Sequence, residues 1–450
     1  MKLYKMKIPY FFFLLITLIL NSCSGQTVET NQSDKSRHNK WMEDLEYFDN
    51  EYLVDSKTFS EDSIAVCKKR IAELKLKVDS LNDNQIILEL SRCVAMADNG
   101  HTTIHLGWMK KIPLRFFWFS DGLYIIKTTN TLSQYLGAKV LMINSIETNK
   151  VQRKLNPYLS GNDNWKKFTA TNYLCSPQVL NGINLSDSSY LNLTLLINSD
   201  TITTQFEISK ATDEKYEYNA WENLYPPKSD TEDDWMHVLD SLGNIPFYLQ
   251  HSDKGAFYYF LDSKKIAYFN LNTTWDRGVK LTDIINEFLD SLKMKQDYSV
   301  IMDLRFNTGG NFMLPLKLAK KTPKIIDDNS KIYLVTSNMT FSAGLVTAAR
   351  IKYFAKDKII IVGEKVGDNL KFWAEGVYYE LPNSGLTIQD SKYAHDWADD
   401  KFVPFKTYWF NLLFGVPAKD LNVDKEIKIS FAEYLKGQDP IIDWIIKQEK

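Results

Sequence analysis

The chain of 450 residues is long enough for two or three domains, and its 44% of hydrophobic residues can bury substantial cores. Its 54 basic and 56 acidic residues nearly cancel, and the net charge of -2 argues against a nucleic-acid partner and against electrostatic selection of a substrate. The composition is that of a globular protein, so evidence for a function has to come from local motifs.

The N-terminus has the pattern of an export signal. Basic residues up to Lys7 precede the apolar run 8–20, which is shorter than the roughly 20 residues that a membrane-spanning helix needs. Residues 20–23 (LNSC) follow at once and resemble the lipobox of bacterial lipoproteins, in which the cysteine is acylated and becomes the new N-terminus. We expect residues 1–22 to be a signal peptide and Cys23 to carry lipid. Ordinary secretory cleavage near this point is the alternative.

The residues from Cys23 onward read as a polar tether. Residues 23–40 contain few apolar side chains and cannot build a core. Ser24 offers no acidic retention signal, so the lipoprotein resemblance implies anchoring in the outer membrane, facing the periplasm. With Cys23 acylated, three cysteines remain at irregular spacing, so neither a disulfide framework nor a Cys-x-x-Cys metal site is expected.

The rest of the chain divides into four parts. Apolar residues first recur at helical spacing, and short strand-like runs broken by Gly, Asn and Ser then predict a small α+β module. A proline pair and an acidic cluster then mark a connection between the module and the last domain. In the last domain, strand-like and helical runs alternate, which predicts β-α units around a mostly parallel sheet. The predicted bounds are 41–107 for the N-terminal helical region, 108–212 for the module, 213–255 for the connection and 256–450 for the last domain.

Two turns in the last domain have the residues for chemistry. Gly309 and Gly310 follow a buried strand, and such a pair lets the backbone approach a ligand and donate its N–H groups. Ser342 stands between a strand and a helix, where a serine is either a nucleophile near the positive end of the helix or simply its N-cap. Taken alone, a tight turn explains the glycines as well as an oxyanion site does, and an N-cap is the commoner role of such a serine.

His101 is the candidate proton acceptor, because histidine is the usual base for a serine nucleophile. It follows the turn signal Asn99-Gly100. A histidine in a turn is more often a surface or satisfied core residue, and proximity of His101 to Ser342 cannot be derived from spacing. The other five histidines form no metal-ligand pattern.

The order of these elements resembles that of the tail-specific, or C-terminal processing, serine peptidases, particularly the branch with the tricorn core and Bacteroidetes-type lipoproteins. The resemblance covers most of the mature chain. Six elements carry it: DNGHT at 98–102, YSVIMDLRFNTGG at 298–310, TSNMTFSAG at 336–344, IIIVGEKVGD at 359–368, LPNSGLTI at 381–388, and GVPAKDLNVDKEI at 415–427 with GQDPIIDWII at 437–446.

This resemblance implies that Ser342 is the nucleophile, that His101 is its general base, and that the amides of Gly309 or Gly310 with that of Ala343 form the oxyanion hole. It implies an α/β fold whose catalytic domain is of the spiral β-β-α type, as in crotonase and ClpP. It also implies that the middle module is PDZ-like, and such modules capture extended peptides by strand addition.

The chain departs from the family pattern at three places. Members of the serine-lysine type carry a lysine after the GExTFG element, and here only Lys365 and Lys371 stand nearby, which makes them the alternative bases. Val366 and Asp368 replace a threonine and a glycine. The acid that assists the histidine in the tricorn branch should stand at 409–414, where WFNLLF holds no carboxylate.

The sequence therefore predicts a membrane-anchored serine endopeptidase-like hydrolase that cleaves peptides or proteins in the cell envelope without a metal or organic cofactor. The rival is a catalytically weak or inactive peptide-binding lipoprotein on the same fold, which the missing acid favours. An esterase is the third possibility, because a serine mechanism does not specify amide over ester. Asp303 and Arg305 are expected to fix the end of their strand.

Replacing Cys23 by Ala should remove the acyl group that makes the protein partition as a lipoprotein, because this cysteine is the expected site of acylation. The measurement is detergent phase partitioning, in which the wild-type protein should enter the detergent phase and Cys23→Ala the aqueous phase. Recovery of both proteins from the aqueous phase in equal amounts would rule out the lipid anchor.

Overall fold

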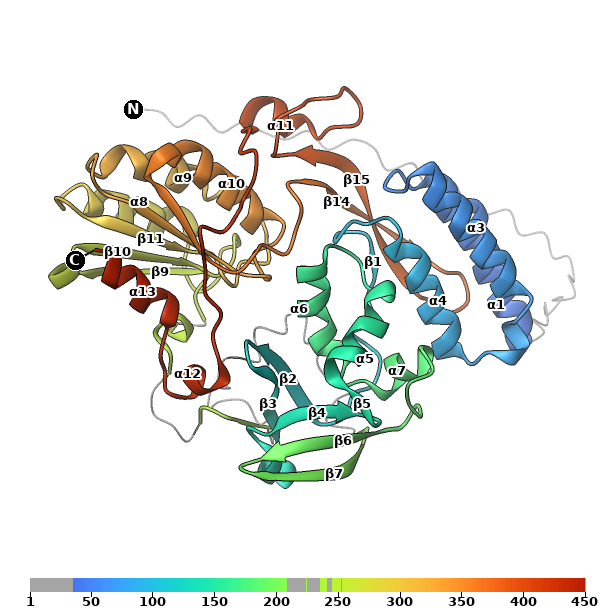
Figure 1. Ribbon diagram of the computed structural model, residues 1–450. Coiled ribbons are helices and arrows are strands. Elements are labelled where there is room, and N and C mark those ends of the chain that lie inside the picture. Colours follow the sequence, from blue (N-terminus) through green and yellow to red (C-terminus); the bar gives the residue numbers. More distant parts are fainter. Residues whose placement is uncertain (1–34, 209–223, 225–234, 241–244, 252, 450) are drawn as a thin grey trace, which may run out of the picture.

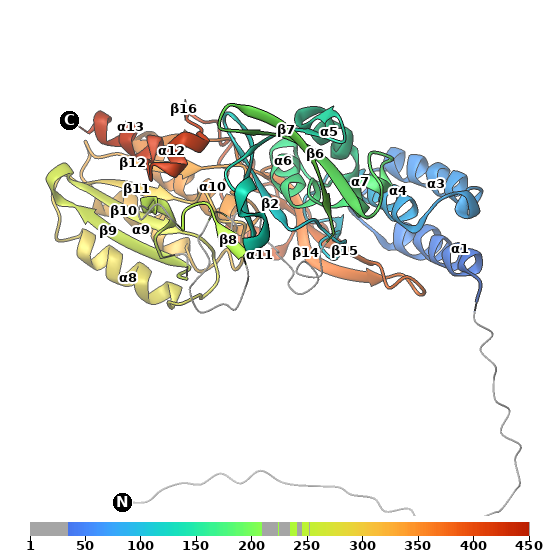
Figure 2. The ribbon, with the colours of Figure 1, turned by 90° about the horizontal axis from the view of Figure 1, so that it is seen from below.

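The computed structural model describes residues 35–208, 224, 235–240, 245–251 and 253–449. The expected signal peptide, Cys23 and most of the tether lie outside these residues, as does much of the expected connection. The described chain is mixed α/β, with an N-terminal layer of helices, a middle module on one large sheet and a C-terminal domain on a second sheet (Figures 1 and 2). No helix within the described ranges is long and apolar enough to cross a membrane.

The N-terminal layer consists of helices that bury one face each. Their bounds are α1 Arg37–Tyr47, α2 Leu53–Asp55, α3 Glu61–Lys75 and α4 Asp83–Ala95. Helix α1 begins four residues before the expected boundary at 41, because the Ser36 hydroxyl accepts a hydrogen bond from the Asn39 amide and caps the helix. The layer is tied to the C-terminal domain by Asp44, whose carboxylate accepts the backbone amides of Asn383 and Ser384, each at 2.8 Å.

The middle module is an antiparallel sheet of strand order β2-β3-β4-β6-β7, with β5 on β4 and β8 on β3. The strands are β2 Leu114–Phe119, β3 Gly122–Thr129, β4 Lys139–Ile143, β5 Ile146–Glu147, β6 Tyr190–Ile197, β7 Asp200–Glu207 and β8 Trp235–His237. Helices α5 (Thr148–Leu155), α6 (Asp163–Tyr173) and α7 (Pro177–Gly182) separate the sheet from α4 (Figure 1). Burial alternates along β6, so one face of the sheet packs on these helices.

The C-terminal domain is built on a six-stranded sheet of order β16-β13-β12-β11-β10-β9. Its central strands pair in parallel, as the alternation of strand-like and helical runs predicted, and β9 joins one edge in the antiparallel direction. The strands are β9 Ala256–Leu261, β10 Ile266–Leu271, β11 Ser299–Asp303, β12 Ile332–Thr336, β13 Ile359–Gly363 and β16 Lys425–Glu426.

Both faces of this sheet are covered. Val300 and Met302 of β11 pack in a core with α8 (Leu281–Leu292), α9 (Leu316–Ile325) and α10 (Ala343–Ala355). Ile301, which points the other way, packs in a second core with α13 (Pro440–Gln448). This explains why the strands are near-continuous apolar runs, since a parallel sheet with two covered faces buries every residue.

A long hairpin joins the three parts. Strands β14 (Lys371–Glu380) and β15 (Thr387–Asp396) run out of the C-terminal domain, and β1 (Thr103–Ile104) pairs with β15, with Thr103 opposite Gln389. The turn before β1 is fixed on the hairpin by Asn99, whose side-chain oxygen accepts the Trp373 amide at 3.1 Å and whose nitrogen donates to Ser391 Oγ at 3.2 Å. The remaining helices are α11 (Trp409–Phe414) and α12 (Phe431–Leu435).

The end of β11 is held by a buried ion network. The Arg305 guanidinium lies 2.7 Å from Asp303 and 2.8 Å from Asp439 at the start of α13. Burial opposes the charge on Arg305, but the two carboxylates outweigh it and raise the pKa of Arg305 well above its ordinary value. The network locks the strand end to α13, which agrees with the structural role expected for Asp303 and Arg305.

Substituting Arg305 by Met should destabilise the protein by about 3–5 kcal/mol, because it leaves two buried carboxylates without their counter-charge. Urea denaturation measures this cost. Lys371→Met is the control, because the Lys371 ammonium is exposed and its ion pair with Asp399 lies at the surface, so its loss should shift the urea midpoint much less. Equal midpoints for the two variants would contradict the assignment of a structural role to Arg305.

Candidate active site

Ser342 occupies a strained position between β12 and α10. Its backbone has φ 50° and ψ -123°, a conformation that costs a non-glycine residue free energy and that the surrounding structure has to hold. Although Ser342 stands at the N-cap of α10, its side chain makes no capping hydrogen bond. The strain is therefore not explained by helix capping, and the hydroxyl is left for another use.

The glycine turn after β11 lies directly against Ser342. A Cβ atom added to Gly309 would come within 2.9 Å of Ser342 Cβ and 3.2 Å of its Oγ, so only glycine fits there. The Gly309 amide is already donated to Asn307 Oδ1 at 3.1 Å. The Gly309 amide is therefore not available as an oxyanion donor. The remaining expected donors are the amides of Gly310, whose φ is 129°, and of Ala343 in the first turn of α10.

His101 is brought to the same place from the turn between α4 and β1. Its ring stacks between Phe341, the neighbour of Ser342, and Phe372 on β14, with ring centroids 4.5 and 5.1 Å apart. Both ring nitrogens are buried and have no hydrogen-bond partner within the described part of the chain. The ring is thus held by aromatic stacking, which fixes its plane and leaves its polar atoms for other partners.

Ser342, His101, Gly309 and Gly310 line one open cavity of about 670 Å³. Large aromatic side chains form much of its wall, among them Tyr158, Trp165, Phe168, Tyr173, Trp275 and Tyr378. The structure therefore brings four of the expected site residues together from two distant parts of the chain. A cavity of this size accommodates several residues of an extended peptide.

The alternative bases lie elsewhere. Lys365 and Lys371 are exposed and do not line this cavity. The Lys371 ammonium is engaged with Asp399 at 2.6 Å.

Asp368 is a site residue that the sequence reasoning did not assign. Its carboxylate oxygen Oδ2 lies 3.7 Å from His101 Nδ1, on a fully buried side chain. In the sequence this position stands out only as a departure from a family glycine, and the family pattern places the acid at 409–414, which holds no carboxylate. One signal in the sequence could have found it. Asp368 follows β13 by a few residues, Ser342 follows β12, and these two strands pair in parallel, so a carboxylate in place of the family glycine can lie near Ser342.

Burial controls the protonation of this pair. It lowers the pKa of His101 to about 3, with a smaller contribution from His395, because the charged imidazolium is poorly solvated there. Burial also raises the pKa of Asp368 to about 8, against the hydrogen bonds from the backbone amides of Asn369 and Ser342. Near neutral pH, His101 is therefore a neutral imidazole that can accept a proton.

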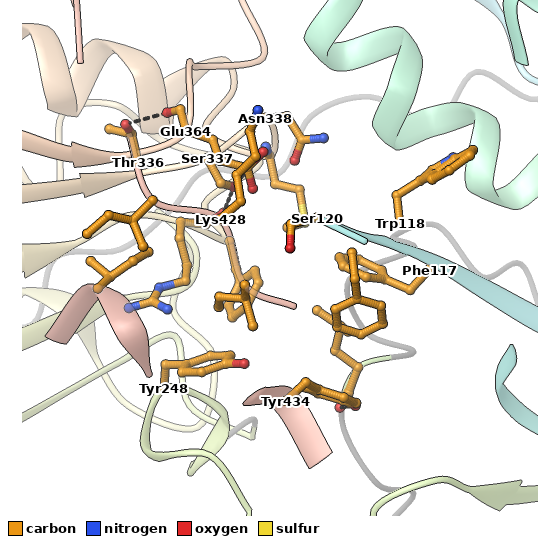
Figure 3. A pocket seen from close by; sticks show the side chains of 18 of the residues that line it. Phe117, Trp118, Ser120, Tyr248, Thr336, Ser337, Asn338, Glu364, Lys428 and Tyr434 are labelled. Atoms are coloured by element: carbon orange, nitrogen blue, oxygen red, sulfur yellow. Dashed lines mark hydrogen bonds between the residues drawn. The ribbon is translucent and has the colours of Figure 1, made fainter. Parts of the chain in front are cut away.

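A second, smaller cavity lies where the middle module meets the C-terminal domain (Figure 3). Its volume is about 60 Å³, and aromatic side chains such as Phe117 and Tyr248 face the polar residues Ser337 and Glu364 across it. None of the expected site residues lines it. Among the described residues, no group of three or more His, Cys, Asp and Glu side chains is arranged to hold a metal ion.

Comparison with known proteins yields structural matches alone, since neither a family model nor a curated protein matches the sequence. Mature CPAF complexed with lactacystin superposes with a TM-score of 0.56 at 11% identity, covering 92% of this chain and 98% of that one. A CPAF mutant gives 0.58 at 10%, covering 92% and 97%.

A putative peptidase from Parabacteroides merdae covers 92% of this chain and 97% of its own, but its TM-score of 0.41 at 13% identity is too low to bear on the site. The chain shares its fold with CPAF. At 10–11% identity this likeness is one of fold alone.

Substituting Asp368 by Asn should stabilise the protein increasingly as the pH rises from about 4 to about 8. In this window the unfolded chain has lost the Asp368 proton, whose ordinary pKa is 3.8, whereas the folded chain keeps it up to about 8. The wild type therefore loses stability with rising pH, and Asn, which does not titrate, avoids the loss. The melting temperature of both proteins across this range measures the effect.

Asp399→Asn, at an exposed carboxylate, is the control. A difference in melting temperature between Asp368→Asn and the wild type that stays constant with pH would contradict the buried, proton-binding state of Asp368.

Proposed function

We propose that the chain is a serine endopeptidase-like hydrolase of the tail-specific type. The observation that carries the proposal is Ser342, a strained serine without a capping bond that opens into the same cavity as His101. A serine on a sharp strand-to-helix turn exposes its Oγ, and the strain is justified when that atom is a nucleophile. The resemblance of the six sequence elements to this family supports the same reading.

The proposed reaction begins with His101 as a neutral base. It takes the Ser342 proton while Oγ attacks the substrate carbonyl carbon, and the carbonyl oxygen acquires negative charge. The amides of Gly310 and Ala343 are the donors proposed for this oxyanion, and losing one such donor typically costs about 3–4 kcal/mol of transition-state stabilisation. His101 then returns the proton to the leaving amine, and water attacks the acyl-enzyme with His101 again as base.

Asp368 is proposed as the acid partner of His101. In molecules whose Asp368 is already ionised, the carboxylate 3.7 Å away stabilises the positive charge that His101 acquires with the Ser342 proton, so each charge offsets the burial cost of the other. The distance is longer than a hydrogen bond, as catalytic contacts often are before substrate binds. Because the lack of an acid was the main argument for a non-catalytic binding protein, Asp368 weakens that rival.

The proposed substrate is a peptide or protein of the cell envelope, with the enzyme held to the outer membrane through Cys23. We interpret residues 108–212 as a PDZ-like module and the C-terminal domain as the spiral β-β-α type. Strand β2 stands at the edge of the module's sheet, where an added strand can pair. An aromatic-walled cavity next to the nucleophile fits extended peptides better than small polar esters.

Ser342→Ala and His101→Ala should each abolish labelling by a fluorophosphonate probe and cleavage of an unstructured polypeptide. The two losses should be similar, because the effects of substitutions within one catalytic unit are not additive. Asp368→Asn should lower turnover by orders of magnitude while the protein stays folded. Lys365→Ala and Lys371→Ala are matched controls and should keep most activity. Gel-based labelling and melting temperatures are measured in parallel.

Two outcomes would overturn the proposal. Labelling that survives in Ser342→Ala would place the nucleophile elsewhere, and a folded wild type that neither labels nor cleaves would leave the binding-protein alternative. An ester substrate turned over without any peptide cleavage would point to the esterase instead.

A further inference from the structure

The segment between β15 and β16 presents an unusual apolar surface. Five of the sixteen exposed large hydrophobic side chains in the described part of the chain fall within eleven residues of it. We call them the apolar patch: Val403, Phe405, Trp409, Leu412 and Leu413. Phe405 is 101% exposed, and Leu412 and Leu413 are each 64% exposed. The other exposed large hydrophobic residues are scattered along the chain. The patch takes no part in the cavity that contains Ser342.

The backbone under the patch is well tied down. Tyr408 donates its amide to Ala394 of β15 at 2.9 Å, and Lys406 accepts the Ala394 amide at 3.0 Å. Inside α11, Asn411 is buried and Phe410 packs edge-on against Phe312, with ring centroids 6.1 Å apart. The exposed side chains are therefore held outward by a fixed scaffold, and α11 lies at the outer edge of the molecule (Figure 1).

The patch is small for a dimer interface. With up to about 150–250 Å² for a large side chain, the five residues together expose roughly 600 Å². A stable dimer buries about 800 Å² on each partner and needs a polar rim that matches. A loop and short helix with exposed Trp, Phe and Leu side chains instead have the composition of segments that insert shallowly into the interface of a bilayer.

The segment of the patch holds basic side chains together with the acidic Asp399 and Asp400. Lys401 and Lys406 are exposed within the segment. The neighbouring Asp399 is neutralised by Lys371 at 2.6 Å and by Lys419 at 3.4 Å. Basic side chains beside an apolar tip attract anionic headgroups, worth about 1 kcal/mol for each charge near the surface.

The maximum span of the tether is comparable to the length of the hairpin that separates α1 from α11. Cys23 precedes Lys35, the first described residue, by twelve positions, which span at most about 40 Å. Nine residues after Lys35, α1 contacts the β14–β15 turn through Asp44. Helix α11 binds the opposite end of the hairpin, where Asn411 donates to the Asp396 carbonyl at 3.5 Å. The hairpin strands have ten residues each and measure about 33 Å.

We propose that the apolar patch is a second membrane-docking site, which inserts into the interface of the bilayer that holds the acylated Cys23. The proposal rests on the lipid anchor of the proposed function. The tether keeps the patch at a high effective concentration near the lipid, so even weak insertion of the patch adds to the attachment. Docking at two points would also fix the orientation of the cavity relative to the membrane.

The test uses the full mature chain with Cys23→Ser, so that the acyl group does not mask the patch. Flotation with vesicles of equal parts phosphatidylethanolamine and phosphatidylglycerol should bring this protein to the lipid fraction. Phe405→Asp and Leu412→Asp should each weaken binding about tenfold or more, because each removes a large side chain from the apolar layer. Leu76→Asp and Met294→Asp are matched controls at isolated exposed positions and should bind like the parent.

Melting temperature and fluorophosphonate labelling are expected to be the same for all variants. No flotation of the Cys23→Ser chain, or equal flotation of patch and control variants, would overturn the docking site. Concentration-dependent dimers that disappear in Phe405→Asp without any change in flotation would assign the patch to a second copy of the chain. Failure of the anchor itself appears separately, as aqueous partitioning of the wild-type protein.

Discussion

The site depends on the seam between the loops that follow β11 and β12. Asn307 lies at its centre: its carbonyl accepts the Phe341 amide at 3.0 Å, and its side chain bonds the Gly309 amide and the Leu271 carbonyl. A Cβ atom on Gly344 would collide with the Asn307 carbonyl oxygen, so glycine is required there. This contact holds Ser342 in a backbone conformation that it would not adopt alone, and parallel pairing brings the two loops to the same edge.

The second half of the site comes from a segment that precedes the sheet by well over a hundred residues. Its turn is built for the hairpin, since Asn99 satisfies the backbone of β14 and the Ser391 hydroxyl of β15 at once. Loss of this docking would remove His101 without touching the core of the C-terminal domain. The hairpin thus couples the N-terminal helices to the site. The apolar patch is held at its opposite end, so the same hairpin sets the positions of the site and of the patch.

Burial supplies the electrostatic character of the site. A solvent-exposed histidine would be partly protonated at neutral pH, whereas the stack between Phe341 and Phe372 excludes water and keeps the imidazole neutral. The same exclusion of water is costly for Asp368. A buried carboxyl that lowers stability is hard to explain as a structural feature, and its place beside His101 Nδ1 gives it a chemical reason.

The sequence by itself determined the mixed α/β class, the parallel strands, the glycine turn and the candidacy of Ser342 and His101, because apolar periodicity and turn residues are local properties of the chain. It did not determine that Gly309 is already bonded, that Lys371 is occupied at the surface, or that Asp368 faces His101. Each of these depends on which loops meet in space. Only the tertiary structure decides which loops meet. The burial of a side chain and its distance to a partner depend on how segments pack, and the number of residues between two segments does not tell whether they are in contact.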